Sequence, residues 1–172
     1  MRDILQGFTV YIGGVDHGID CEEIGLPTPK VVQQEYRGGG MDLAVNQGMA
    51  ALEALEATFK FAGHARNILS KVARGPGKFI TVTARGAVLN ALTGEHEAHV
   101  VVLNGQFNDH SRDAWKRSEK GGIEVTLSGI IAYRYEIANA IMHDIQAYPP
   151  RRVISGVDEL AAINTILGYA NG

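Results

Sequence analysis

The sequence is poor in several features that would each point to a particular class of protein. It has one cysteine, Cys21, which excludes an intrachain disulfide and a cysteine-rich metal site. Its 16 lysines and arginines are outnumbered by 19 aspartates and glutamates, and the net charge of −3 is unlike that of proteins that grip nucleic acid. No run approaches the roughly 20 apolar residues that span a bilayer, so we expect no membrane span. Residues 1–6 lack the apolar stretch of a secretory signal peptide, and we expect folding in a reducing cytoplasm.

The chain is rich in glycine and in apolar side chains. Apolar residues make up 45 % and charged residues 20 % of the 172 residues, which is typical of a globular protein of one domain. The 21 glycines favour many turns and long strands over a helical bundle. We therefore expect a single domain over residues 1–172.

Alternation of apolar and polar side chains predicts strands over most of the chain. Ile123, Val125 and Leu127 fall on one face of a pleated strand, and Glu124 falls on the other. The predicted strands are residues 8–12, a short one within 15–26, 31–36, 55–61, 79–90, 95–107 and 123–146, the last divided by a turn near Asn139. Residues 92–94 are expected to form a hairpin turn, and Pro149-Pro150 to end the sheet.

Two segments are predicted as helices. Residues 64–73 carry an apolar stripe at helical spacing, and Gly75-Pro76-Gly77 follows as a stop signal. Residues 155–167 are expected to form a C-terminal helix, with Ser155 or Asp158 as the N-cap and Gly168 past its end.

One segment carries conflicting signals. Residues 49–57 are rich in Ala, Leu and Glu, which favour a helix, but strict alternation from Leu55 onward favours a strand. We favour the strand. The total of seven to nine strands with two helices predicts a mainly β sandwich or barrel-like fold. Because long strands need their edges paired, one solution is closure of the sheets of several copies into one larger barrel.

Two loops interrupt this pattern. Gly38-Gly39-Gly40 is expected to open a flexible loop that runs to about Gly48. Residues 108–122 form a polar loop around the single tryptophan, Trp115, flanked by charges of both signs. Such a run is typical of a solvated loop with one anchoring aromatic residue. Stacking on a nucleic-acid base and a protein interface fit the same residues.

Residues that could carry catalysis are sparse. Glu95, Glu97 and His99 would share one face of a strand and could bind a divalent ion, although a polar strand face is the simpler interpretation. Asp109-His110-Ser111 contains the residue types of a catalytic triad, but neighbours in sequence rarely converge as nucleophile, base and orienting group. We predict no catalytic residue, no resident metal and no cofactor.

Several segments together form a recognisable pattern. They are residues 8–14 and 26–30, residues 35–42 (Glu-Tyr-Arg-Gly-Gly-Gly-Met-Asp), Trp115-Lys116, Tyr133-Arg134-Tyr135-Glu136, and residues 156–160. In this order they resemble the major tail tube proteins of contractile-tailed phages, with 8–14 and 26–30 as the N-terminal hairpin, 35–42 as the most recognisable motif and 156–160 as the closing helix. R-type bacteriocin tubes share the pattern. It covers almost the whole chain in order. Residues 74–90 and 49–56 match less closely.

The resemblance implies a tail tube fold, a β-sandwich with a flanking helix and a short C-terminal helix. Six copies would pair their sheets into a ring, and rings would stack into the hollow inner tube of a contractile tail, the conduit for genome delivery. Its partners would be copies of itself, the sheath, tape-measure, baseplate and tail terminator proteins, and DNA that passes without specific binding. The protein would reside in the virion tail and, during assembly, in the host cytoplasm.

The same resemblance suggests which residues contact other copies. They are Tyr36, Arg37, Gly38, Gly39, Gly40, Met41, Asp42 and Trp115. The polar sides of the strands in 79–90, 95–107 and 123–138 are candidates for the channel lining. The alternatives are the inner tube of a bacteriocin or of a bacterial contractile secretion system and, from different classes, a metal-dependent hydrolase or a monomeric binding module.

Overall fold

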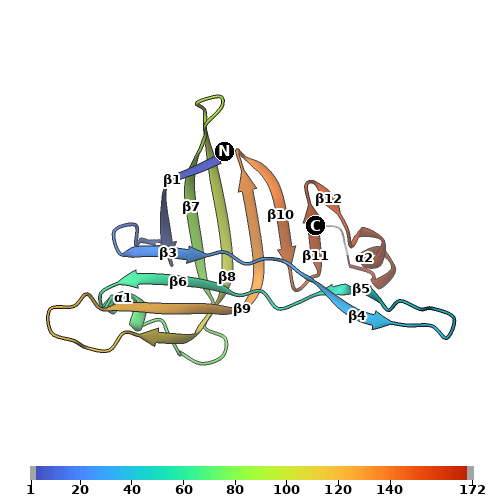
Figure 1. The fold of residues 1–172 in the computed structure, drawn as a ribbon, viewed down its shortest axis with the longest axis horizontal. Coiled ribbons are helices and arrows are strands. Elements are labelled where there is room, and N and C mark those ends of the chain that lie inside the picture. The colour runs from blue at the N-terminus through green and yellow to red at the C-terminus, as the bar shows by residue number, and fades with distance from the viewer. Residues whose placement is uncertain (1–2, 170–172) are drawn as a thin grey trace.

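The computed structural model describes residues 3–169, which form twelve strands and two short helices (Figure 1). The strands are β1 (Asp3–Ile12), β2 (Val15–Asp16), β3 (Cys21–Gly25), β4 (Val31–Tyr36), β5 (Val45–Leu52), β6 (Ala57–Ala62), β7 (Ile80–Asn90), β8 (His96–Arg112), β9 (Gly122–Ile137), β10 (Ala140–Gln146), β11 (Arg151–Ile154) and β12 (Val157–Asp158). The helices are α1 (Arg66–Leu69) and α2 (Ala161–Leu167). The expectation of a mainly β fold with one internal and one C-terminal helix is confirmed.

An antiparallel sheet in the order β12-β11-β10-β9-β8-β7-β1-β2 forms the larger layer. Its centre consists of the long strands whose alternation the sequence displays. β7 and β8 pair from Ile80↔Gly105 to Leu89↔His96, so residues 91–95 form the expected hairpin turn. β9 and β10 turn at Ala138 and Asn139, both with positive φ, as expected near Asn139.

A second layer arises because β8 and β9 bend. The first half of β9 pairs with the end of β8 on one side and with β6 on the other, and β6 pairs with β3. In Figure 1 this layer runs across the view, while the main sheet runs up it. The bend lies where the β8–β9 register shifts between Asn104 and Gln106. A Cβ on Gly105 would lie 3.0 Å from the Ser128 carbonyl oxygen, so a larger residue there would force the two backbones slightly apart.

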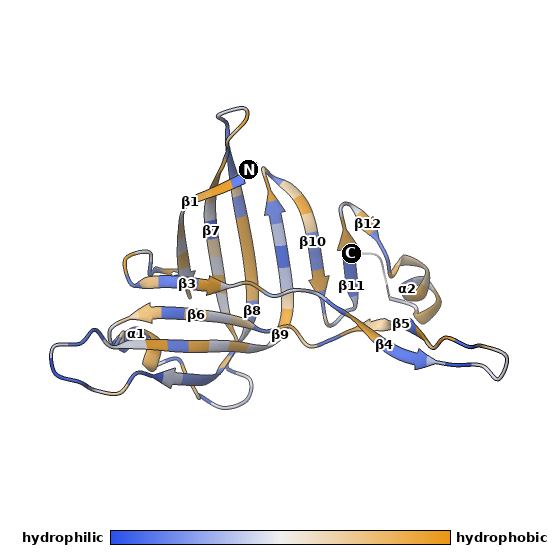
Figure 2. Cartoon of the chain, in the orientation of Figure 1, coloured by the Kyte–Doolittle hydropathy of each residue, from blue (hydrophilic) through white to orange (hydrophobic). Residues whose placement is uncertain are grey.

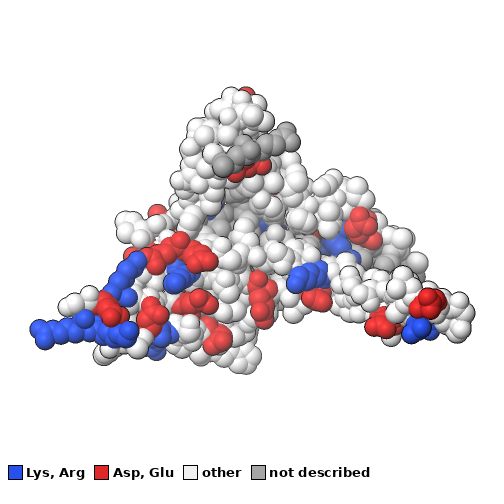
Figure 3. All heavy atoms as spheres, viewed as in Figure 1, with Lys and Arg blue, Asp and Glu red and all other residues white. Residues whose placement is uncertain are grey.

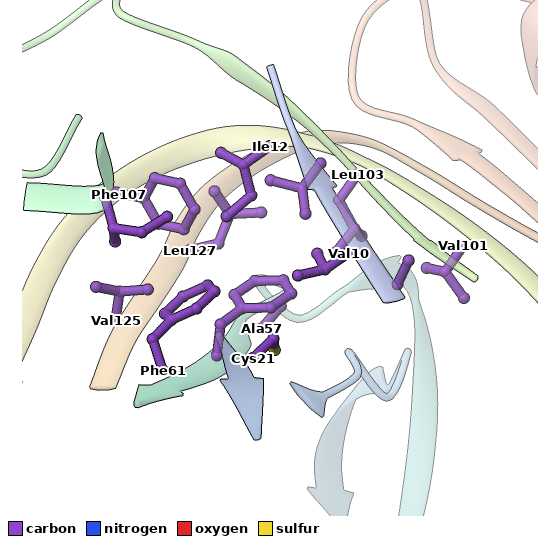
Figure 4. Packing of buried hydrophobic residues seen from close by; sticks show 14 of the residues in the cluster. Val10, Ile12, Cys21, Ala57, Phe61, Val101, Leu103, Phe107, Val125 and Leu127 are labelled. Atoms are coloured by element: carbon purple, nitrogen blue, oxygen red, sulfur yellow. The ribbon is translucent and has the colours of Figure 1, made fainter. Parts of the chain in front are cut away.

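The hydrophobic core lies between the two layers. Side chains from β1, β3, β6, β8 and β9 converge there (Figure 4), and hydropathy alternates along the strands that supply them (Figure 2). Phe59 and Phe61 are fully buried from β6, and the Phe59 and Phe107 rings meet edge to face at 6.2 Å. The alternation from Leu55 onward therefore reports a real strand. Ala57, Phe59 and Phe61 are its buried residues. The Ala- and Leu-rich residues 49–52 also lie in a strand, because they belong to β5, which pairs with β4.

Three predicted boundaries are wrong. β8 continues to Arg112, so the loop predicted over 108–122 comprises only residues 113–121. The polar residues 109–112 belong to the strand because they pair through their backbones with residues 123–126 of β9. β5 begins at Val45, so the loop between β4 and β5 comprises residues 37–44, shorter than 38–48. Pro149-Pro150 does not end the sheet, because β11 and β12 follow it.

The helices are shorter than predicted. α1 spans Arg66–Leu69 within the predicted 64–73. α2 begins at Ala161 and not near Ser155, because Ser155 and Gly156 adopt positive φ in the β11–β12 turn. The Asp158 carboxylate accepts a hydrogen bond from the Leu160 backbone N–H at 2.9 Å, so it shapes the turn before the helix and does not cap α2. Gly168 ends α2 in the left-handed conformation, as predicted.

Candidate functional site

β4 and β5 form a two-stranded hairpin that stands apart from the rest of the fold. They pair only with each other among the strands of residues 3–169, and the hairpin projects beyond the body on the right of Figure 1. Two backbone-directed contacts secure its base. The Glu53 N–H donates to the Lys30 carbonyl at 2.8 Å, and the Arg152 guanidinium donates to the Ala50 carbonyl at 2.7 Å. An isolated hairpin is only marginally stable in water, so we expect another surface to pack against this one.

The loop at the hairpin tip contains most of the predicted contact residues, and it is internally ordered. The Arg37 side chain folds back and donates hydrogen bonds to the carbonyls of Met41 at 3.4 Å and Asp42 at 3.3 Å. The Met41 N–H donates to the Gly38 carbonyl at 3.0 Å. Gly39 and Gly40 have no atom of the described residues within 4 Å of the position of a Cβ, so no contact within residues 3–169 requires glycine there.

Apolar side chains cover the hairpin without being buried. Tyr36 is 58 % exposed and Leu43 is 75 % exposed. The other exposed large apolar residues of the hairpin are Val31, Met41, Val45 and Met49. Such a patch on a projecting element is typical of a protein–protein contact.

Trp115 lies at the opposite end of the molecule from the hairpin tip. It sits in the loop between β8 and β9, on the left of Figure 1, and is 85 % exposed. Its ring lies 5.8 Å from that of His64. The same loop carries a Lys116–Glu119 ion pair at 3.3 Å and pairs Lys120 with Glu22, and Figure 3 shows basic side chains gathered at this end. The structure therefore brings residues 36–42 together and places Trp115 in a separate region.

One face of the main sheet is polar and has no covering element within the described chain. Its side chains alternate with the buried ones, so Val82 and Val101 point into the core while Thr83 and Val102 point away from it. The uncovered face is formed by Thr9, Tyr11, Thr81, Thr83, Arg85, Ala87, Ala98, Val100, Val102, Asn104, Ala132, Arg134, Glu136, Asp144 and Arg151.

Charges on this uncovered face are largely paired within it. The Arg134 guanidinium donates to Glu136 at 2.6 Å, and the Arg151 guanidinium pairs with Asp144 at 2.9 Å. Arg85 forms no ion pair with any residue between 3 and 169. The face is therefore polar but nearly neutral.

The metal candidates do not converge. Glu97 and His99 share a face of β8, but Glu95 lies in the turn before it. His99 Nδ1 lies 2.7 Å from the Tyr135 hydroxyl and makes a hydrogen bond with it. Over residues 3–169, no group of three or more His, Cys, Asp or Glu residues is placed to hold a metal ion. Asp109, His110 and Ser111 alternate along β8, so they do not point to one place.

Titratable groups in the core are held in their neutral forms. Burial raises the pKa of the Cys21 thiol to about 11 and that of the Tyr133 hydroxyl to about 12. Burial, followed by the nearby Lys71 charge, lowers the pKa of His17. Neither ring nitrogen of His17 has a hydrogen-bond partner among the described residues, although Asp20 lies 3.9 Å away. These shifts favour a structural role for each group.

Sequence reasoning missed two exposed apolar features. One is the outer side of α2, where Ile163, Ile166 and Leu167 face solvent. The other is an apolar groove of about 310 Å³ beside β1, which includes Leu5 and Leu26 in its lining. The spacing of Ile163, Ile166 and Leu167 was a visible helical stripe, but only the structure shows that the stripe faces outward.

In the described chain no helix has the length and apolar character needed to cross a membrane. A comparison with curated proteins finds no match. A comparison with protein families finds one that spans nearly the whole chain: the family described as phage tail tube protein FII matches residues 2–168.

Proposed function

Because the chain belongs to the phage tail tube protein FII family, we propose that its copies form hexameric rings that stack into the inner tube of a contractile tail. The tube is the conduit through which the genome leaves the particle. As a member of a structural family of the phage tail, the protein would act through assembly and not through catalysis. It would assemble in the host cytoplasm and reside in the virion.

Free sheet edges support closure of the ring. From Asp3 to Thr9, β1 pairs with β7 on one side and with no described strand on the other. The opposite edge of the same sheet ends in the two-residue strand β12. An unpaired edge is a template for another chain, and joining these two different edges around a circle leaves no edge exposed.

The single observation that carries the stacking proposal is the projecting β4–β5 hairpin. It extends beyond the body and exposes Tyr36, Met41 and Leu43 at and beside its tip. A contact between this tip and a different surface of a copy in the next ring is heterologous, so it propagates along the tube instead of closing. Trp115, in a separate region, is suited to a second contact of the same kind.

The uncovered polar face of the main sheet is the proposed lining of the channel. Its charges are paired, as in Arg134–Glu136 and Asp144–Arg151, so it offers DNA phosphates few free cations. Each free cation on a channel wall would retain DNA through counterion release. A nearly neutral lining lets DNA pass without specific binding.

The proposed partners outside the tube follow from its place in a tail. The outer surface would meet the sheath protein, the channel would hold the tape-measure protein during assembly, and the tube ends would meet baseplate and tail terminator proteins. The inner tube of a bacteriocin or secretion particle would use the same surfaces.

A hairpin variant tests the stacking role. Leu43→Asp places a charge on the exposed tip, and we expect rings without tubes in negative-stain electron microscopy of the concentrated protein. The matched control Leu43→Met keeps an apolar side chain and should form tubes like the unaltered protein. Tubes of normal length from Leu43→Asp would contradict the proposed stacking contact, and monomers of the unaltered protein at every concentration would contradict the proposed function.

A further inference from the structure

The large apolar side chains of helix α2 face solvent and do not pack against the helix's own domain. The only side chain of the helix that is buried is the polar Asn164, whose amide donates to the Pro150 carbonyl at 2.7 Å. Ile166 is 84 % exposed, and Ile163 and Leu167 are also exposed. A seven-residue helix is not stable by itself in water, and its apolar face needs a partner.

The groove beside β1 is the complementary feature at the other edge of the main sheet. It holds about 310 Å³ and is lined chiefly by apolar residues from β1, β7 and β8 and from the segment that follows β3. Leu5 is 57 % exposed and Leu26 is 42 % exposed, so the groove is open. Two of its three polar members, His99 and Tyr135, are hydrogen-bonded to each other at 2.7 Å, so an apolar occupant need not leave them unpaired. The third, Arg85, alternates with Ala84 along β7, so its side chain belongs to the opposite, uncovered face of the sheet.

The groove and α2 lie on the same face of the sheet, at opposite edges. The groove is on the face of β7 and β8 that carries Val88 and Val101, the face that points to the core. Leu160, the residue before α2, lines a pocket together with Leu55 and Tyr133 of the core cluster, so the chain enters α2 from that side of the sheet. Figure 1 shows α2 beyond β11 and β12, outside the edge of the sheet, and Figure 2 shows its apolar character. α2 therefore lies beside the edge at which another chain would join the sheet.

We propose that in the ring the side of α2 formed by Ile163, Ile166 and Leu167 docks into the groove beside β1 of the neighbouring copy. This inference rests on the proposed function, because ring closure brings the β12 edge of one copy to the β1 edge of the next. A neighbour that continues the sheet places its groove directly under the overhanging helix. Residues 161–167 carry no charge, so the docking buries aliphatic side chains without burying a charge.

Disulfide trapping between two different variants tests the contact. Leu5→Cys and Ile166→Cys chains are mixed, assembled and oxidised, and linked dimers are counted on a non-reducing gel. Dimers should form in the mixture and disappear when the assembly is diluted apart before oxidation. Neither variant alone should match the mixture, and Cys21 adds little background because it is buried.

Ala87→Cys is the matched control for Leu5→Cys. Ala87 is exposed and adjoins the groove residue Val88 along β7, but it points to the opposite face of the sheet. Mixed with Ile166→Cys it should give no dimers. Equal yields from Ala87→Cys and Leu5→Cys would overturn the proposal.

A second variant tests the energetics. Ile166→Asp should raise the concentration needed for assembly by about tenfold or more, because the charge would enter an apolar groove. The thermal midpoint of the unassembled chain should stay unchanged, because the side chain is exposed there. Thr165→Asp, on another side of the same helix, is the control and should assemble normally. Normal assembly of Ile166→Asp without trapping would overturn this contact and leave the tube proposal standing, whereas failure of the unaltered chain to assemble would overturn both.

Discussion

Gly105→Ala tests whether the bend of β8 creates the two layers. A Cβ at this position would lie 3.0 Å from the Ser128 carbonyl oxygen and 3.1 Å from both Ile130 Cγ1 and Leu127 Cγ. The carbonyl belongs to the β9 backbone, so it cannot retreat without disturbing the pairing of the two longest strands. Overpacking of this kind costs about 1–3 kcal/mol.

The gain from replacing glycine partly offsets this cost. Alanine in a strand is favoured over glycine by roughly 0.5–1 kcal/mol, which leaves a net loss of about 2 kcal/mol when the strain is near the upper end of its range. For a chain of this length the loss corresponds to a fall in Tm of about 4–8 °C. Thermal unfolding followed by circular dichroism, at a dilution where the chain is unassembled, measures it.

Gly7→Ala is the matched control for this experiment. Gly7 is also a strand glycine, but no atom lies within 4 Å of the position of its Cβ and its φ is not positive. We expect Gly7→Ala to raise Tm slightly, by about 1–4 °C. A Tm for Gly105→Ala equal to or above that of the unaltered chain would refute the steric account of the bend.

Three further predictions concern the core. Phe59→Ala removes a fully buried ring that packs on Phe107 and should lower the free energy of unfolding by about 3–5 kcal/mol in urea titration. The lowered pKa of His17 means that the folded state disfavours its protonation, so stability should be full above about pH 6.5 and fall as the pH drops below it. His17→Gln should flatten this part of the curve, and an unchanged slope would contradict the assignment. Cys21, with its pKa raised to about 11, should react with a thiol reagent at pH 8 about a hundredfold more slowly in the folded chain than in urea; equal rates would show that the thiol is not buried.

Alternation made the central strands predictable from sequence. Residues 79–90 and 123–137 alternate because one face of each strand is buried, and their positions in the structure follow that pattern. The turn at Asn139 and the end of α2 at Gly168 were predictable because both depend on local backbone conformation. The turn and the helix end are therefore determined by residues adjacent in the sequence.

Features that depend on distant pairing were not predictable. The polar residues 108–112 predict a loop, but they form a strand because β9 pairs with their backbone. Val45 to Leu52 is a strand because β4 lies beside it, although its second half has helix propensity. The β11–β12 hairpin follows two prolines that would ordinarily end a sheet.

The candidate contact residues illustrate the same limit. The sequence indicated the motif at 36–42 and Trp115, but only the structure shows that they occupy opposite ends of the molecule. The burial of Asn164 and the exposure of Ile166 invert the usual logic of an amphipathic helix, because this helix is anchored through a side-chain amide. No periodicity reveals which side of a short helix is anchored.

Cryo-electron microscopy of the purified, concentrated protein tests the central claim most directly. We predict hollow tubes of stacked six-membered rings, with the face that carries Thr83, Arg134 and Glu136 lining the channel and the β4–β5 hairpin reaching the next ring. Monomers at every concentration, or a tube whose channel is lined by a different surface, would contradict the account.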